Sequence, residues 1–83
     1  MRIRILFFSI LQDLVGAGEI EEMLSQDRKW KVSDLLEILY AKYEGLREWD
    51  GKILVALDRE YVDKDKELAD GQELAIMPPV QGG

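Results

Sequence analysis

The most regular helical pattern in this chain lies in residues 31–43, and strand-like runs precede and follow it. Its leucines and tyrosines recur three and four positions apart, which gathers them on one face of a helix. Ser33 is the expected N-cap, and Asp34 lies in the first turn, where the helix dipole favours an acidic side chain. A helix with one apolar face needs a second layer to cover that face. We therefore expect this helix to lie on a sheet built from the other segments.

The remaining apolar segments have the alternation and the turn boundaries of β-strands. The predicted strands are residues 2–8, 19–24, 52–57, 61–62 and 73–77. Residues 9–15 have helical spacing and stop at Gly16, which favours a short helix. This order fits one mixed sheet with the main helix packed across one face, which is the α+β β-grasp, or ubiquitin-like, fold. The handedness rule for crossovers leads us to expect the third strand to be parallel to the first.

A chain of 83 residues has room for one small domain. We expect residues 1–77 to form the β-grasp domain and residues 78–83 to form an extended tail. No run approaches the roughly 20 apolar residues of a membrane span. The start of the chain alternates like a strand and lacks the continuous apolar segment of a signal peptide. These features predict a cytoplasmic protein that does not bind membranes.

The sequence contains no cysteine and no histidine, and its net charge is −6. The usual zinc ligands, thiol nucleophiles and the commonest general base are absent, so no metal site is expected. The acidic balance disfavours nucleic acid, whose phosphates require basic side chains, and favours a protein partner with a basic surface. The closest acidic pairs are Glu21 with Glu22 and Asp58 with Glu60, and we expect both pairs to be solvated.

The last residues form the most distinctive part of the sequence, because Gly82 and Gly83 follow a proline-rich stem. The stem consists of Pro78, Pro79, Val80 and Gln81. Two prolines fix φ and favour an extended shape, so the tail reaches up to roughly 20 Å at about 3.3 Å per residue. Glycines lack Cβ and can pass through a narrow channel in a partner. We expect Gly83 to be the reactive residue, whose ionised carboxylate needs activation, for example as an acyl adenylate.

Several segments of this sequence resemble the small, sulfur-carrier subunit of molybdopterin synthase. They are the start at residues 5–8, the middle at residues 51–57, the turn at residues 70–71 and the ending at residues 76–83. The Pro-Pro-Val-x-Gly-Gly ending is the specific part of the resemblance. The other segments are shared by ubiquitin-like carriers in general.

The resemblance implies a sulfur carrier in molybdenum cofactor biosynthesis. An E1-like adenylating enzyme would use ATP to activate Gly83, and a sulfur source would convert its carboxylate into a thiocarboxylate. The carrier would then dock on the large subunit of molybdopterin synthase, in a 2:2 heterotetramer. It would donate sulfur to a cyclic pterin precursor bound by that subunit, which also supplies the catalytic side chains. Gly82 would be the threading residue, and this chain itself would bind no cofactor.

The same family docks through an apolar patch on the outer face of the sheet. Strand parity assigns Leu6, Phe8, Ala75 and Met77 to this patch. Many relatives have an aromatic side chain in place of Met77. The alternative is that residues 9–15 simply cover Leu6 and Phe8.

Other functions stay open at this point. A sulfur carrier for thiazole synthesis in the thiamine pathway shares the fold and the Gly-Gly ending, although such carriers tend to lack the Pro-Pro-Val stem. A ubiquitin-like modifier would instead be joined through Gly83 to lysines of target proteins. The third alternative is an interaction module whose tail carries no cargo.

Overall fold

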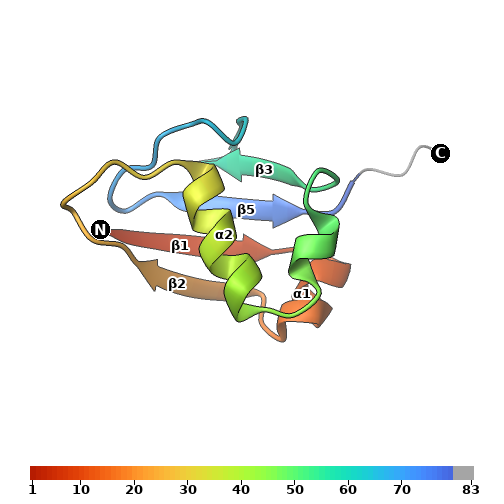
Figure 1. Cartoon of the computed structure of the whole chain (residues 1–83). Helices are drawn as coiled ribbons and strands as arrows, with labels where there is room; N and C mark the ends of the chain where they lie inside the picture. Colours follow the sequence, from red (N-terminus) through yellow and green to blue (C-terminus); the bar gives the residue numbers. More distant parts are fainter. Residues whose placement is uncertain (80–83) are drawn as a thin grey trace.

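The computed structural model describes residues 1–79, in which one main helix lies across one face of a five-stranded mixed sheet (Figure 1). The strands are β1 (Arg2–Phe7), β2 (Glu19–Met23), β3 (Leu54–Leu57), β4 (Glu60–Tyr61) and β5 (Glu73–Met77). The helices are α1 (Ile10–Val15), the main helix α2 (Val32–Lys42) and the 3-10 helix η1 (Leu46–Trp49). Within the sheet, the strands lie side by side in the order β2-β1-β5-β3-β4. This arrangement is the predicted β-grasp fold.

The direction of the third strand differs from the prediction. β1 and β5 lie side by side in parallel, and β3 pairs antiparallel with β5. β3 is therefore antiparallel to β1, and the expectation of a parallel third strand was wrong. The reason is that α2 follows β2, which is itself antiparallel to β1. The crossover through α2 thus makes β3 parallel to β2, and the strand parallel to β1 is the last one.

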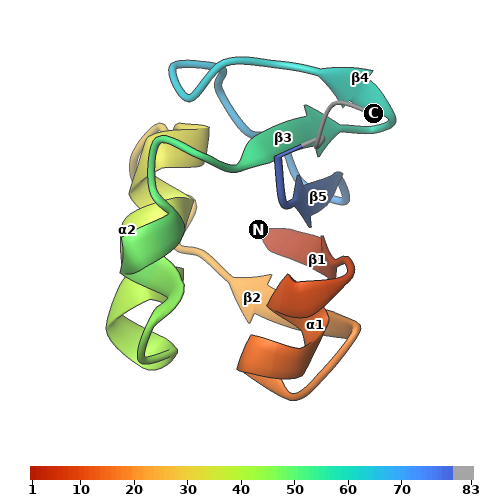
Figure 2. The same ribbon diagram turned by 90° about the vertical axis from the view of Figure 1, so that its right-hand side faces the viewer.

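The core lies between α2 and one face of the sheet (Figure 2). Alternate strand residues point toward the helix, as the period of a β-strand requires. The sheet contributes Ile3, Ile5, Phe7, Val55, Leu57, Leu74 and Ile76 to this core. The helix contributes Val32, Leu35, Leu36, Leu39 and Tyr40. The predicted apolar stripe of the helix therefore forms the second layer of the domain.

The N-terminus of α2 is held by a loop that is distant in sequence. The backbone N–H of Ser33 donates to the carbonyl of Lys64 at 2.9 Å. The N-cap residue is Lys31, whose N–H donates to Asp34 Oδ2 at 2.9 Å. The expected cap at Ser33 is therefore wrong. Carbonyl groups of the loop accept hydrogen bonds from N–H groups at the start of the helix, where a serine hydroxyl is a common acceptor. Because the loop is distant in sequence, no local pattern could reveal these hydrogen bonds.

Glu22 is buried, although the acidic pair that contains it was expected to be solvated. Glu22 is 7% exposed, and its Oε2 atom lies 2.6 Å from Nζ of Lys42. This ion pair joins β2 to the last turn of α2. The carboxylate can be buried because a charged partner accompanies it.

We expect Leu39→Ala to lower the free energy of unfolding by about 2–5 kcal/mol, because the Leu39 side chain is fully buried and its removal leaves a cavity. Urea unfolding followed by circular dichroism measures the change. Met23→Ala serves as the control, because Met23 is 66% exposed. The control should stay within about 0.5 kcal/mol of the parent chain. Equal losses in the two variants would contradict the assigned core.

Candidate functional site

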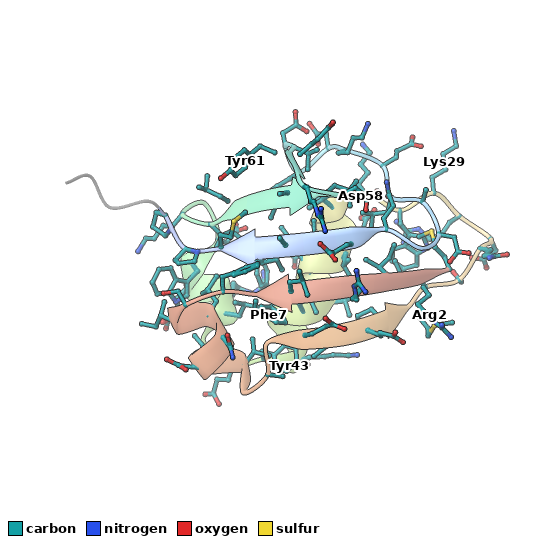
Figure 3. All side chains as sticks on the ribbon, turned by 180° about the vertical axis from the view of Figure 1, so that it is seen from behind. Arg2, Phe7, Lys29, Tyr43, Asp58 and Tyr61 are labelled. Carbon is teal, nitrogen blue, oxygen red and sulfur yellow. The ribbon has the colours of Figure 1, made fainter. Side chains whose placement is uncertain are left out.

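The face of the sheet opposite α2 has a charged half and an apolar half (Figure 3). Figure 3 views this face and places Arg2 where β1 begins and Tyr61 beside β3. In the charged half, Arg2 pairs with Glu21 at 3.6 Å and Arg4 pairs with Glu73. The Glu73 carboxylate raises the pKa of the Arg4 guanidinium through its hydrogen bond, so each charge offsets the other.

The apolar half is built from one row of side chains across four strands. Leu6 pairs with Ala75, Ala75 pairs with Ala56, and Ala56 pairs with Tyr61. These residues line an open groove of about 450 Å³, together with Phe8, Met77, Arg59 and Glu73. Parity places the whole row on one face, and the register of the sheet places its members side by side.

All four residues of the predicted patch line this groove. They are Leu6, Phe8, Ala75 and Met77. The Phe8 residue is 44% exposed, so the alternative in which residues 9–15 cover it is wrong. Instead, α1 packs against β1 and η1, and its Leu11 is buried in the core. The structure thus brings the patch together and leaves it open, while its role in docking stays a prediction.

Sequence reasoning missed four further residues of the groove, which are Ala56, Arg59, Tyr61 and the ion-paired Glu73. Ala56 lies on a predicted strand, and the same parity argument could have found it. Tyr61 is 72% exposed and reaches the groove only because β4 pairs with β3. Arg59 belongs to the turn between these strands, and nothing in the sequence assigns a direction to its side chain.

The turn that carries Arg59 has an unusual backbone. Asp58 and Arg59 have φ of 49° and 72°, which is the left-handed region that a two-residue type I′ hairpin requires at both positions. The Asp58 carboxylate accepts hydrogen bonds from the N–H of Glu73 at 3.0 Å and from Gln72 Nε2 at 3.2 Å. These bonds offset the strain at Asp58. Within residues 1–79, the Arg59 side chain makes no ion pair that would do the same.

The groove lies where the tail begins. β5 ends at Met77, and the half-buried Pro78 and Pro79 follow it. Val80, Gln81, Gly82 and Gly83 lie outside the described residues, so the roles predicted for them stay predictions.

The described part of the chain offers no other obvious chemistry. Among residues 1–79, no three acidic side chains gather closely enough to hold a metal ion. Each helix in the same range is too short or too polar to cross a bilayer.

Comparison with known proteins decides the family. The ThiS family profile matches residues 5–83. This chain belongs to the ThiS family. One protein similar to this ThiS-family chain is the "Molybdopterin synthase sulfur carrier subunit" of Chlamydomonas reinhardtii. It is 35% identical over 85 residues, and the alignment covers 100% of both chains.

Solved structures resemble this ThiS-family chain along its whole length. SAMP1 of Haloferax volcanii matches with a TM-score of 0.85 and 25% identity, and 100% of each chain is covered. The complex of subunits 1 and 2 of molybdopterin-converting factor from Helicobacter pylori matches with a TM-score of 0.71 and 27% identity, again over 100% of each chain. These likenesses agree with the β-grasp fold derived from the strand order.

We expect Arg59→Gly to raise the free energy of unfolding by roughly 0.5–1 kcal/mol. Relief of left-handed strain contributes about 1–2 kcal/mol, and the greater freedom of glycine in the unfolded chain removes about 0.4–1 kcal/mol of that gain. Urea unfolding measures the difference from the parent chain.

Asp58→Gly is the matched control, because it relieves the same kind of strain but removes the hydrogen bonds to residues 72 and 73. We expect it to gain less than Arg59→Gly, or to lose stability. A larger gain at position 58 would contradict this account of the turn.

Proposed function

We propose that this protein is a sulfur carrier in molybdenum cofactor biosynthesis. An E1-like enzyme joins the Gly83 carboxylate to the AMP portion of ATP and releases pyrophosphate. A sulfur donor then displaces AMP and leaves a thiocarboxylate at Gly83. The carrier docks on the large subunit of molybdopterin synthase in a 2:2 assembly, and its sulfur passes to a cyclic pterin precursor. ATP and the pterin are bound by the partners.

The observation that carries this proposal is the similarity to sulfur carrier subunits of molybdopterin synthase. The relative from Chlamydomonas reinhardtii is 35% identical over 100% of both chains. A thiocarboxylate at Gly83 also suits the composition, because the chain contains no cysteine that could carry sulfur as a persulfide.

The geometry supports the same proposal. Met77 lines the groove and is followed directly by the stem that leads to Gly83. A partner that covers the groove lies beside the start of the tail, which reaches up to roughly 20 Å when extended. Docking and delivery can therefore involve one partner, with the domain outside its active site and the glycines inside.

Intact mass spectrometry tests the loading step. The chain is incubated with its adenylating enzyme, ATP and a sulfide source, and we expect the mass gain that corresponds to replacement of one oxygen by sulfur. Gly82→Ala should abolish loading or transfer, because a Cβ obstructs a channel shaped for glycine. Its urea unfolding curve should match that of the parent chain. An unmodified mass in the parent reaction would count against a carrier role.

A binding experiment separates the two cofactor pathways. We expect the thiocarboxylated chain to form a stable complex with the large subunit of molybdopterin synthase and to leave a thiazole synthase unbound. A complex with the thiazole synthase alone would replace the molybdenum assignment by the thiamine pathway.

A second candidate function is protein modification through Gly83. The likeness to SAMP1 of Haloferax volcanii, which belongs to the small archaeal modifier proteins, favours it. Conjugates of higher mass in cells, lost on deletion of Gly83, would support this function. Their absence, together with sulfur loading in vitro, would leave the carrier function alone.

A further inference from the structure

Arg59 stands out among the five arginines of the chain. Arg2, Arg4, Arg28 and Arg47 each form an ion pair with a carboxylate. Within residues 1–79 the structure gives Arg59 no such partner. The acid on the same groove, Glu73, is already paired with Arg4. Within residues 1–79, the groove therefore presents one cation that forms no ion pair.

The backbone at Arg59 adds an independent observation. Its φ of 72° lies in a region where glycine is the favoured residue of a type I′ turn. Folding alone would be better served by glycine at this position. Strain of this kind is characteristic of positions held for function, and an observed outlier is the proper starting point for such a hypothesis.

From these observations we infer that Arg59 is a specificity residue of the docking groove, and that it pairs with an aspartate or glutamate of the partner that packs there. This inference rests on the proposed function and takes that partner to be the large subunit of molybdopterin synthase. The apolar residues of the groove contact an apolar side chain of the partner. Arg59 forms an ion pair with a carboxylate that lies beside that side chain.

Desolvation is the physical reason that the partner must supply an acid. A partner that covers the groove removes water from Arg59, and a charge buried without a counter-ion is strongly unfavourable. Arg59 and the exposed Tyr61 also belong to the residue types that dominate binding energy at interfaces.

The charge of Arg59 is opposite in sign to the net charge of the whole chain. The net charge of −6 attracts basic surfaces from a distance, but a basic side chain placed against Arg59 is repelled. Only a partner that is basic overall and carries an acid at the groove satisfies both conditions. A basic protein without an acid at the groove is attracted by the net charge of the chain but binds more weakly, because Arg59 then has no counter-ion in the interface.

The experiment measures the Kd of the chain for the large molybdopterin synthase subunit of its own organism. We expect Arg59→Gln to raise the Kd at least tenfold at about 0.05 M salt, and by a smaller factor at about 0.5 M salt, because salt screens charge pairs. Arg59→Lys should recover part of the affinity, because it restores the charge without the planar fork of arginine.

Lys29→Gln is the matched control. It removes one positive charge from a residue that Figure 3 places near the end of the molecule where β1 begins, away from Tyr61. We expect its Kd to stay within about twofold of the parent value, since exposed charges that lie farther apart than the Debye length, which is about 10 Å at 0.1 M salt, are largely screened.

Arg59→Gly separates a binding role from a structural one. We expect this variant to unfold at higher urea concentration than the parent chain and still to bind at least tenfold more weakly. Replacing the acidic residues of the large subunit by amides, one at a time, should identify one whose effect on Kd disappears in the Arg59→Gln background.

Parent-like affinity in both Arg59→Gln and Arg59→Gly, with normal binding by the parent chain, would overturn the inference and leave the proposed function standing. Failure of the parent chain to bind the large subunit would overturn both. Coupling of Arg59 to a second copy of this chain, detected as a dimer that Arg59→Gln dissociates, would also overturn it.

Discussion

The parallel pairing of β1 with β5 is the contact on which the rest of the structure depends. It joins the first and last strands, with Ile5 opposite Leu74 and Leu6 opposite Ala75. One register therefore sets both faces of the sheet. On the inner face it completes the core under α2, and on the outer face it assembles the centre of the groove. A slip of one residue would exchange these two faces.

The same pairing determines where the chain leaves the domain. Because β5 lies at the centre of the sheet, the chain leaves the domain from a well-supported strand. Pro78 ends that strand, since proline has no N–H to donate to a neighbouring strand. The chain thus enters the stem from a central strand whose Met77 lines the groove, so the groove lies beside Pro78, where the predicted tail begins.

The elements that sequence analysis predicted well are those with a clear local pattern. The periodicity of residues 31–43 identified α2, and alternation identified β1 and β5 together with their outward residues Leu6 and Ala75. The failures involve contacts between distant segments. The carbonyl of Lys64, in a distant loop, accepts a hydrogen bond from the N–H of Ser33, which is therefore not the helix cap. Lys42 of α2 forms an ion pair with Glu22, which allows that carboxylate to be buried.

The sequence by itself determined the helix, the strands, the absence of thiol and imidazole chemistry, and the glycine ending on which the proposed function rests. Periodicity and residue chemistry are local properties, so they can be read along the chain. Only the tertiary structure decided the direction of β3, the position of Tyr61 in the groove and the unpaired state of Arg59 within the described residues. These features depend on which strands pair and on which charges meet across the sheet, and such contacts exist only after the chain has folded.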